Sequence, residues 1–204
     1  MKIALIGASG KIGSRILAEL LQRGGHTITA IARHPEGVPA HAQVTAVQGD
    51  INHTEALSGL LRGHDVIASS APFVPGISPL LLQAVRGSGV KRFVVVGGAG
   101  TLKKSDGTLV KDDPHIPPEW LPAINEGGSL LKLLRADQQL DWTFFSPAAL
   151  IGPGERTGKF RLGGDDLIVA ADGKSSISYD DYAIAFVDEV DRPQHLRRRF
   201  TIGY

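Results

Sequence analysis

The sequence predicts an α/β fold, a doubly wound and mostly parallel sheet with helices on both faces. Short apolar segments rich in β-branched residues alternate with segments of helical periodicity. The apolar segments lack a polar side, which is typical of strands buried on both faces. At 204 residues the chain is long enough for one well-buried domain and too short for two full ones. We therefore expect one domain over residues 1–204.

The first half of the chain supplies the clearest alternation. Residues 2–7, KIALIG, form an apolar segment of strand length, and the helix after it has Ile16, Leu17 and Leu20 on one face. Gly24 and Gly25 follow the last helical residue, where glycine commonly ends a helix. The expected elements here are a strand at 2–7, a helix at 11–22, strands at 27–32 and 44–48, a helix at 54–61 and a strand at 65–70.

The second half continues the pattern but is interrupted twice. Residues 101–126 contain four prolines and mixed charge, and residues 152–176 are glycine-rich with little helical period. Both stretches follow predicted strands, so we expect them to be loops on the substrate side. The expected regular elements are a helix at 77–86, a strand at 92–98, a helix at 130–140, a strand at 141–146 and a helix at 183–187.

Composition excludes several classes of function. A net charge of +1 gives no electrostatic case for a nucleic acid partner, and the one dense basic run, Arg197–Arg199, is more typical of a solvated strand edge. The absence of cysteine excludes disulfides and thiolate chemistry. No apolar run approaches the ~20 residues of a membrane span. We expect a cytoplasmic protein without a membrane partner, and the histidines show no metal-ligand spacing.

A glycine-rich turn lies between the first strand and the first helix. Gly7, Gly10 and Gly13 make a G-x-x-G-x-x-G motif in the strand–turn–helix context that dinucleotide binding requires. Gly7 allows the sharp turn, Gly10 the approach of backbone to phosphate, and Gly13 close helix–strand packing. The helix N-terminus offers its free N–H groups to a diphosphate. The motif predicts a Rossmann-type nicotinamide dinucleotide site that also includes Ser9, Lys11 and Ile12.

The end of the second strand indicates which dinucleotide is bound. An NAD site usually has an acidic residue there to accept from the ribose 2′-hydroxyl, whereas this chain has Arg33. Charge-assisted bonds from an arginine to a 2′-phosphate contribute ~1.5–3 kcal/mol. An arginine that stacks on adenine would not discriminate between the two. We expect NADP, with NAD as the alternative.

Further cofactor contacts are expected where other strands end. Asp50, next to Ile51, is placed to accept from the adenine amino group, although it could instead cap the following helix. Small residues after the next two strands would let the cofactor lie against backbone in the crevice at the carboxyl ends of the strands. These small residues are Ser70, Ala71, Gly97 and Gly98.

Nearly the whole chain resembles the atypical short-chain dehydrogenase/reductases. The resemblance rests on GASGKIGSRI, Arg33, Gly49-Asp50, KRFVVVGGAG, DWTFFSPAALIGPGERTGK and ISYDDYAIA. The most similar group is NAD(P)H-flavin reductase-like, and the biliverdin reductase B-like and NmrA-like proteins are relatives. The resemblance implies a small C-terminal substrate region and NADP or NAD as cofactor. It also places Pro147 beside the nicotinamide, although a simple strand stop would explain this proline too.

The sequence departs from the wider family at its catalytic motif. Active dehydrogenases use Tyr-x-x-x-Lys, but Tyr179 and Tyr182 have no lysine four residues on, and Tyr204 is the last residue. Carbonyl or hydroxyl chemistry needs such a positioned acid or base. Hydride transfer to a flavin or quinone-like acceptor can proceed without it, because solvent can supply the remaining proton. The alternatives are an NmrA-like sensor that binds the dinucleotide without turnover, and a sugar epimerase or dehydratase.

Four residues are candidates for the acceptor pocket. Phe73 could stack on a flat acceptor or pack in the core, and Trp120 could be a pocket lid or a loop anchor. Thr101 and His115 are polar residues that could relay a proton, although a lone loop histidine is more often a surface residue. We expect a small-molecule acceptor, and a protein that is a monomer or a homodimer.

Overall fold

The computed structural model describes residues 1–204 and has one large sheet at its centre. Its eight strands lie in the order β3-β2-β1-β4-β5-β6-β10-β8, and all pair in parallel except β8, which is antiparallel to β10. The first six strands are β1 (Lys2–Ile6), β2 (Thr27–Ala32), β3 (Val44–Gln48), β4 (Val66–Ser69), β5 (Arg92–Val96) and β6 (Asp141–Ser146). The doubly wound α/β fold predicted from the sequence is confirmed.

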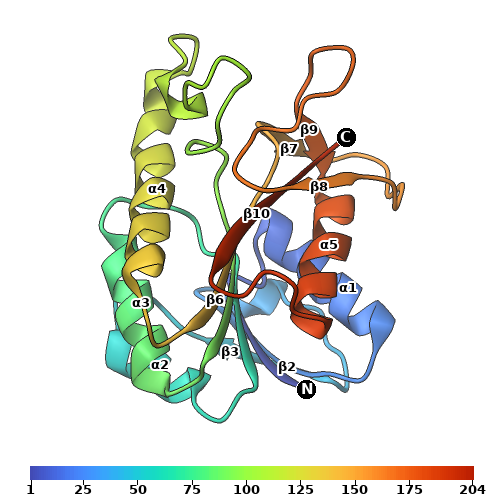
Figure 1. Ribbon diagram of the computed structural model, residues 1–204. Helices are drawn as coiled ribbons and strands as arrows, with labels where there is room; N and C mark the ends of the chain where they lie inside the picture. The colour runs from blue at the N-terminus through green and yellow to red at the C-terminus, as the bar shows by residue number, and fades with distance from the viewer.

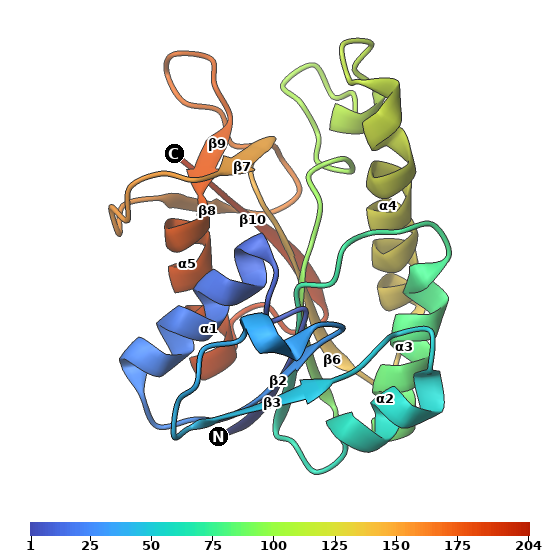
Figure 2. The ribbon, with the colours of Figure 1, turned by 180° about the vertical axis from the view of Figure 1, so that it is seen from behind.

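Helices cover both faces of this sheet. In Figure 1, α2 (Thr54–Leu61), α3 (Ile77–Ser88) and α4 (Leu121–Ala136) lie on one side. On the other side α1 (Lys11–Arg23) packs against α5 (Tyr179–Asp191). The view from behind in Figure 2 shows the same two layers. No helix is both long and apolar enough to span a membrane.

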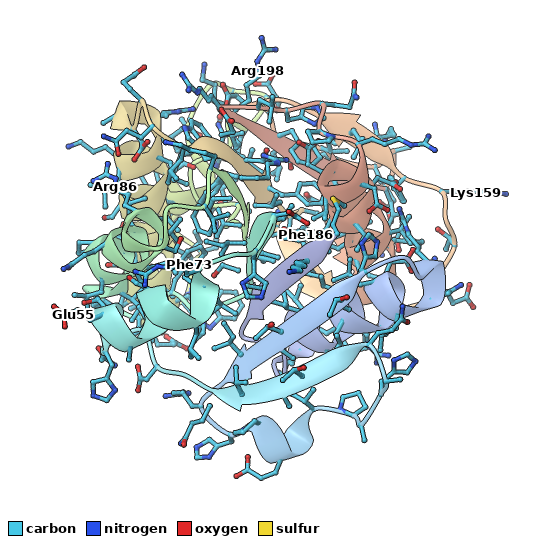
Figure 3. All side chains as sticks on the ribbon, turned by 90° about the horizontal axis from the view of Figure 1, so that it is seen from below. Glu55, Phe73, Arg86, Lys159, Phe186 and Arg198 are labelled. Carbon is cyan, nitrogen blue, oxygen red and sulfur yellow. The ribbon has the colours of Figure 1, made fainter.

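Each face of the sheet has its own apolar core. The α1–α5 face buries large side chains such as Leu20, Phe145 and Phe186, and the α2–α4 face buries Phe93 and Phe144. Figure 3 shows Phe186 inside the molecule, while the charged Glu55 and Lys159 project at its periphery. Burial on both faces explains why the strands have no polar side in the sequence.

The C-terminal part adds short strands around the end of the sheet. A separate two-stranded sheet pairs β7 (Leu150–Gly152) with β9 (Ser176–Ser178), and β8 (Arg161–Gly163) pairs with β10 (Arg198–Gly203). In Figure 1 the segments between residues 101 and 120 and between 153 and 175 both lie at the upper end of the view. They meet there, because Lys103 exchanges backbone hydrogen bonds with Asp165 and Leu167.

Two local expectations were wrong, one of them only in part. The helix expected from residue 130 begins at Leu121, because Pro122 occupies the first turn, where a helix loses no hydrogen bond to proline. The basic run Arg197–Arg199 is only partly a solvated strand edge, since Arg197 and Arg198 are exposed as expected but Arg199 is buried. Arg199 is only 9% exposed and donates to Thr101 and Asp165, so its charge is paired inside the fold.

Candidate active site

The turn between β1 and α1 requires its glycines for steric reasons. Gly7 has a φ of 78°, and a Cβ on it would lie 2.6 Å from the Ser70 carbonyl oxygen. A Cβ on Gly13 would lie 2.0 Å from the Gly7 oxygen. Gly10 is less crowded, with the nearest atom at 3.2 Å. The structure thus supports the predicted roles of Gly7 in turning the chain and of Gly13 in close packing.

The N-terminus of α1 is open to a ligand. Its first flanking residue is Gly10, no side chain caps it, and its first turn contains no acidic residue. The backbone N–H groups of such a turn have no partner inside the helix, and the helix dipole adds positive potential. Lys11 adds a positive charge at the same end. This combination fits a diphosphate and would reject a cation.

A cavity of about 680 Å³ begins at this turn and crosses the carboxyl edge of the sheet. A volume of this size is typical of a cofactor or small-molecule site. Its wall includes most of the residues that the sequence nominated for cofactor contact, and it includes Phe73, nominated for substrate. The nominated residues in the wall are Gly7, Ser9, Gly10, Lys11, Ile12, Arg33, Asp50, Ile51, Ser70, Ala71, Phe73 and Gly97.

One end of the cavity is polar and lies beyond β2 and β3. Arg33 has an exposed side chain there, and its carbonyl accepts a hydrogen bond from Gln48. Asp50 accepts from the backbone and side-chain nitrogens of Asn52 through one oxygen, Oδ1. These bonds, the backbone one foremost, hold the pKa of Asp50 below its ordinary value. Asp50 therefore stabilises a turn, and its second oxygen stays available for a ligand.

The other end of the cavity is apolar and receives residues from both faces of the sheet. Phe73, on the α3–α4 side, is close to two glycines, since a Cβ on Gly98 would be 3.7 Å and one on Gly127 3.2 Å from its ring. Ile151 and Tyr179 reach the same cavity from β7 and α5. A flat conjugated molecule fits such a wall better than a sugar, whose hydroxyls would lack partners there.

Three nominated residues do not line the cavity. Gly98 is one position beyond the wall, and its carbonyl accepts from Ser146. Pro147 is buried directly after β6. Trp120 is 54% exposed in the short turn before α4, away from the cavity lining. Of the two candidate proton relays, Thr101 is bonded to Arg199, and His115 is 93% exposed and paired with Asp113.

Among the residues of the cavity wall that sequence reasoning missed, Ile151 and Tyr179 come from the part of the chain most distant in sequence from the glycine-rich turn. Both belong to the C-terminal third of the chain, whose path over the sheet no local pattern specifies. The helix expected at 183–187 begins four residues earlier, at Tyr179, and Asp180 and Asp181 lie in its first turn. Nothing in the sequence indicated that this helix would begin beside the first one.

The fold and the cavity together define a Rossmann-type dinucleotide-binding protein. The family model described as NAD(P)H-binding matches residues 7–193. The chain belongs to this NAD(P)H-binding family.

The similar proteins have several different names. An uncharacterized protein of Bacillus subtilis, YwnB, is 39% identical over 99% of this chain and 98% of its own. A putative epimerase from Bacteroides thetaiotaomicron is 40% identical, with a TM-score of 0.93 over 100% of this chain and 96% of that one. A putative NADH-flavin reductase from Streptococcus pneumoniae is 34% identical, with a TM-score of 0.82 over 100% and 99%.

Proposed function

We propose that the protein is an NADPH-dependent oxidoreductase that passes hydride to a flat conjugated acceptor, a flavin or a quinone-like molecule, without a Tyr-Lys dyad. The observation that carries the proposal is the cavity itself. An open helix N-terminus with a lysine adjoins a polar end, and an apolar end with an aromatic side chain follows in the same space. This arrangement suits a dinucleotide beside a planar partner.

No lysine follows a tyrosine at the spacing of the dyad, and two of the three phenols donate to other groups of the protein. Tyr182 is fully buried, and its hydroxyl donates to the Phe145 carbonyl at 2.6 Å. Burial raises the pKa of Tyr182 well above its ordinary value. Tyr204 donates to Asp181 at 2.8 Å. Neither of these two phenols is available to a hydroxyl substrate, and Tyr179 lacks the lysine partner of the dyad, which disfavours epimerase or alcohol dehydrogenase chemistry.

The chain's own groups then have three tasks. Backbone N–H groups in the first turn of α1 and the Lys11 ammonium bind the diphosphate, and Arg33 pairs with a 2′-phosphate. The reduced nicotinamide, when bound, supplies hydride. Phe73, held against glycine backbone, keeps the acceptor flat and excludes water from it. Positioning at near-attack distance is the main source of acceleration in this scheme.

Two measurements test the proposal. Isothermal titration with NADPH and NADH should show tighter binding of NADPH, and equal or tighter binding of NADH would contradict the role of Arg33. Mixing the protein with NADPH and FMN or 1,4-naphthoquinone should accelerate loss of the nicotinamide absorbance. Binding without acceleration for any flavin or quinone would instead indicate a sensor that does not turn the cofactor over.

A further inference from the structure

Tyr179 is the one phenol that faces the cavity. It is half-buried in the wall, on the opposite face of the sheet from Phe73. The hydroxyls of Tyr182 and Tyr204 each donate to a protein oxygen, whereas that of Tyr179 has no partner within the chain. Its hydrogen-bonding capacity is therefore free for a molecule in the cavity.

The backbone of Tyr179 is held firmly in this position. It is the first residue of α5, and the preceding Ser178 accepts from the Asp181 N–H at 3.0 Å. The following Asp180 lies 3.7 Å from Arg15 of α1, which connects the beginnings of the two helices. The start of α5, from which the Tyr179 side chain extends, is thus held by contacts on both sides.

The position of Tyr179 relative to the glycine-rich turn determines what it can touch. Ile12 and Ile151 line the cavity with it, while Arg33 and Asp50 lie at the far, polar end. Ser9 and Lys11 belong to the turn that is assigned to the diphosphate, which leaves Ser70 and Tyr179 as the protic side chains away from both. Of these two, a phenol is a much stronger acid than an aliphatic alcohol.

We propose that Tyr179 is a catalytic residue that donates a hydrogen bond, and then its proton, to an oxygen of the acceptor. This inference rests on the proposed function and narrows the acceptor class to quinone-like molecules. In the reaction, the C4–H bond of NADPH breaks and its hydrogen leaves as hydride with both electrons, giving NADP⁺. The hydride ends in one O–H bond of the hydroquinone, the Tyr179 proton forms the other at the second quinone oxygen, and water returns a proton to the phenolate. The sum is NADPH, quinone and one proton to NADP⁺ and hydroquinone.

A flavin should depend less on this group. Its reduced form can remain an anion after hydride arrives, so proton donation at that moment contributes less. We therefore expect Tyr179→Phe to lower kcat with 1,4-naphthoquinone on the order of a hundredfold, the size typical of general acid catalysis. With FMN the loss should stay below about tenfold, and the Kd for NADPH should stay within about threefold.

The matched control is Tyr182→Phe, the same chemical change three residues along the same helix. Tyr182 contacts no cavity, so its variant should fold less stably but keep both rates at a temperature where it is fully folded. Equal losses with naphthoquinone and FMN in Tyr179→Phe, or a rate within threefold of wild type, would overturn the proposal. Wild-type protein that reduces neither acceptor would refute the proposed function, and this inference with it.

A spectroscopic readout needs no turnover. The chain has three tyrosines, so ring-¹³C-labelled tyrosine gives three phenol resonances that single Phe variants assign. Adding 1,4-naphthoquinone to the NADP⁺ complex should shift the Tyr179 resonance and leave those of Tyr182 and Tyr204 unchanged. An unmoved Tyr179 resonance at saturating quinone, with the other two as internal references, would also overturn the proposal.

Discussion

Two helix N-termini lie near each other at the carboxyl edge of the sheet, and their chemistry is opposite. The first turn of α1 has glycine before it, no side-chain cap and no acid. The first turn of α5 has Ser178 as a cap and two acids, Asp180 and Asp181. Both ends have the same unpaired N–H groups by geometry. The start of α5 has a side-chain cap for one of these groups, whereas the start of α1 has none and keeps its capacity for a ligand.

The N-terminus of α5, called the closed end here in contrast to the open end of α1, also holds the loop that contains Thr157 and Gly158. Asp181 is fully buried and accepts from the backbone N–H groups of Thr157 and Gly158 and from the hydroxyls of Thr157 and Tyr204. The negative charge at the N-terminus of α5 thus belongs to the chain's own Asp181, which holds a loop in place, and not to a bound anion. The comparison shows that a helix N-terminus can serve as an anion site when no side chain caps it and no acidic residue lies in its first turn.

The largest effect is expected from closing the open end. In Gly13→Ala the new methyl would lie 2.0 Å from the Gly7 carbonyl oxygen, so the turn must move. We expect a loss of roughly 3 kcal/mol in unfolding free energy, the upper range for overpacking, and NADPH binding weakened beyond detection by titration. The control is Gly59→Ala in α2, where the Cβ meets nothing and the helix should gain up to about 1 kcal/mol. Normal NADPH affinity in Gly13→Ala would contradict the assignment of the turn.

The next largest effect is expected from the buried carboxylate of the closed end. Asp181→Asn replaces an acceptor of four hydrogen bonds by a group with only one acceptor atom. We expect a loss of about 2–3 kcal/mol in denaturant unfolding. The neighbouring Asp180→Asn removes only a partly exposed contact with Arg15 and should cost about 0.5 kcal/mol or less. Equal effects of the two variants would show that the buried network does not stabilise the loop.

The same carboxylate predicts a dependence on pH. Burial alone would raise the pKa of Asp181, but the hydrogen bonds from Thr157, Gly158 and Tyr204 outweigh it and lower the pKa below the ordinary value. A lowered pKa in the folded state stabilises the protein above the unfolded pKa of about 3.9. This contribution is lost as the pH falls through the folded value. The stability gap between wild type and Asp181→Asn should therefore be complete at about pH 6 and shrink below about pH 4.

A third effect is expected on cofactor affinity, from Arg33 at the polar end of the cavity. Arg33→Ala removes the one positive side chain placed for a 2′-phosphate, so the Kd for NADPH should rise about ten- to a hundredfold. The Kd for NADH, which lacks that phosphate, should change less than about threefold. Arg62→Ala, an exposed arginine just after α2 and outside the cavity wall, is the control. Parallel weakening of both dinucleotides would indicate stacking on adenine in place of phosphate recognition.

Sequence could predict the open end more fully than the closed one. The glycine-rich turn is local, because the strand, the turn and the helix that define it occupy residues 2–23. The wall that Tyr179 completes depends on α5 packing beside α1, more than 150 residues earlier in the chain. Arg199 shows the same limit, since its sequence neighbours are exposed arginines while its partner Asp165 is over 30 residues away. Trp120, for which the sequence left both a pocket lid and a loop anchor open, lies outside the cavity lining.

The smallest effect is expected from removing the cap of α5, and it tests directly whether the two helix N-termini have different roles. Ser178→Ala removes the cap of α5, whose oxygen accepts from the Asp181 N–H at 3.0 Å. Loss of such a cap typically costs about 1 kcal/mol, which chemical denaturation can measure. The control is Ser129→Ala on α4, where the hydroxyl only donates back to the Asn125 carbonyl and the change should stay within about 0.5 kcal/mol. Affinity for NADPH should be unchanged in both, because the α5 end satisfies itself and does not bind the cofactor. A tenfold weaker Kd in Ser178→Ala at full folding would mean that both helix starts share the ligand, and the contrast between them would no longer hold.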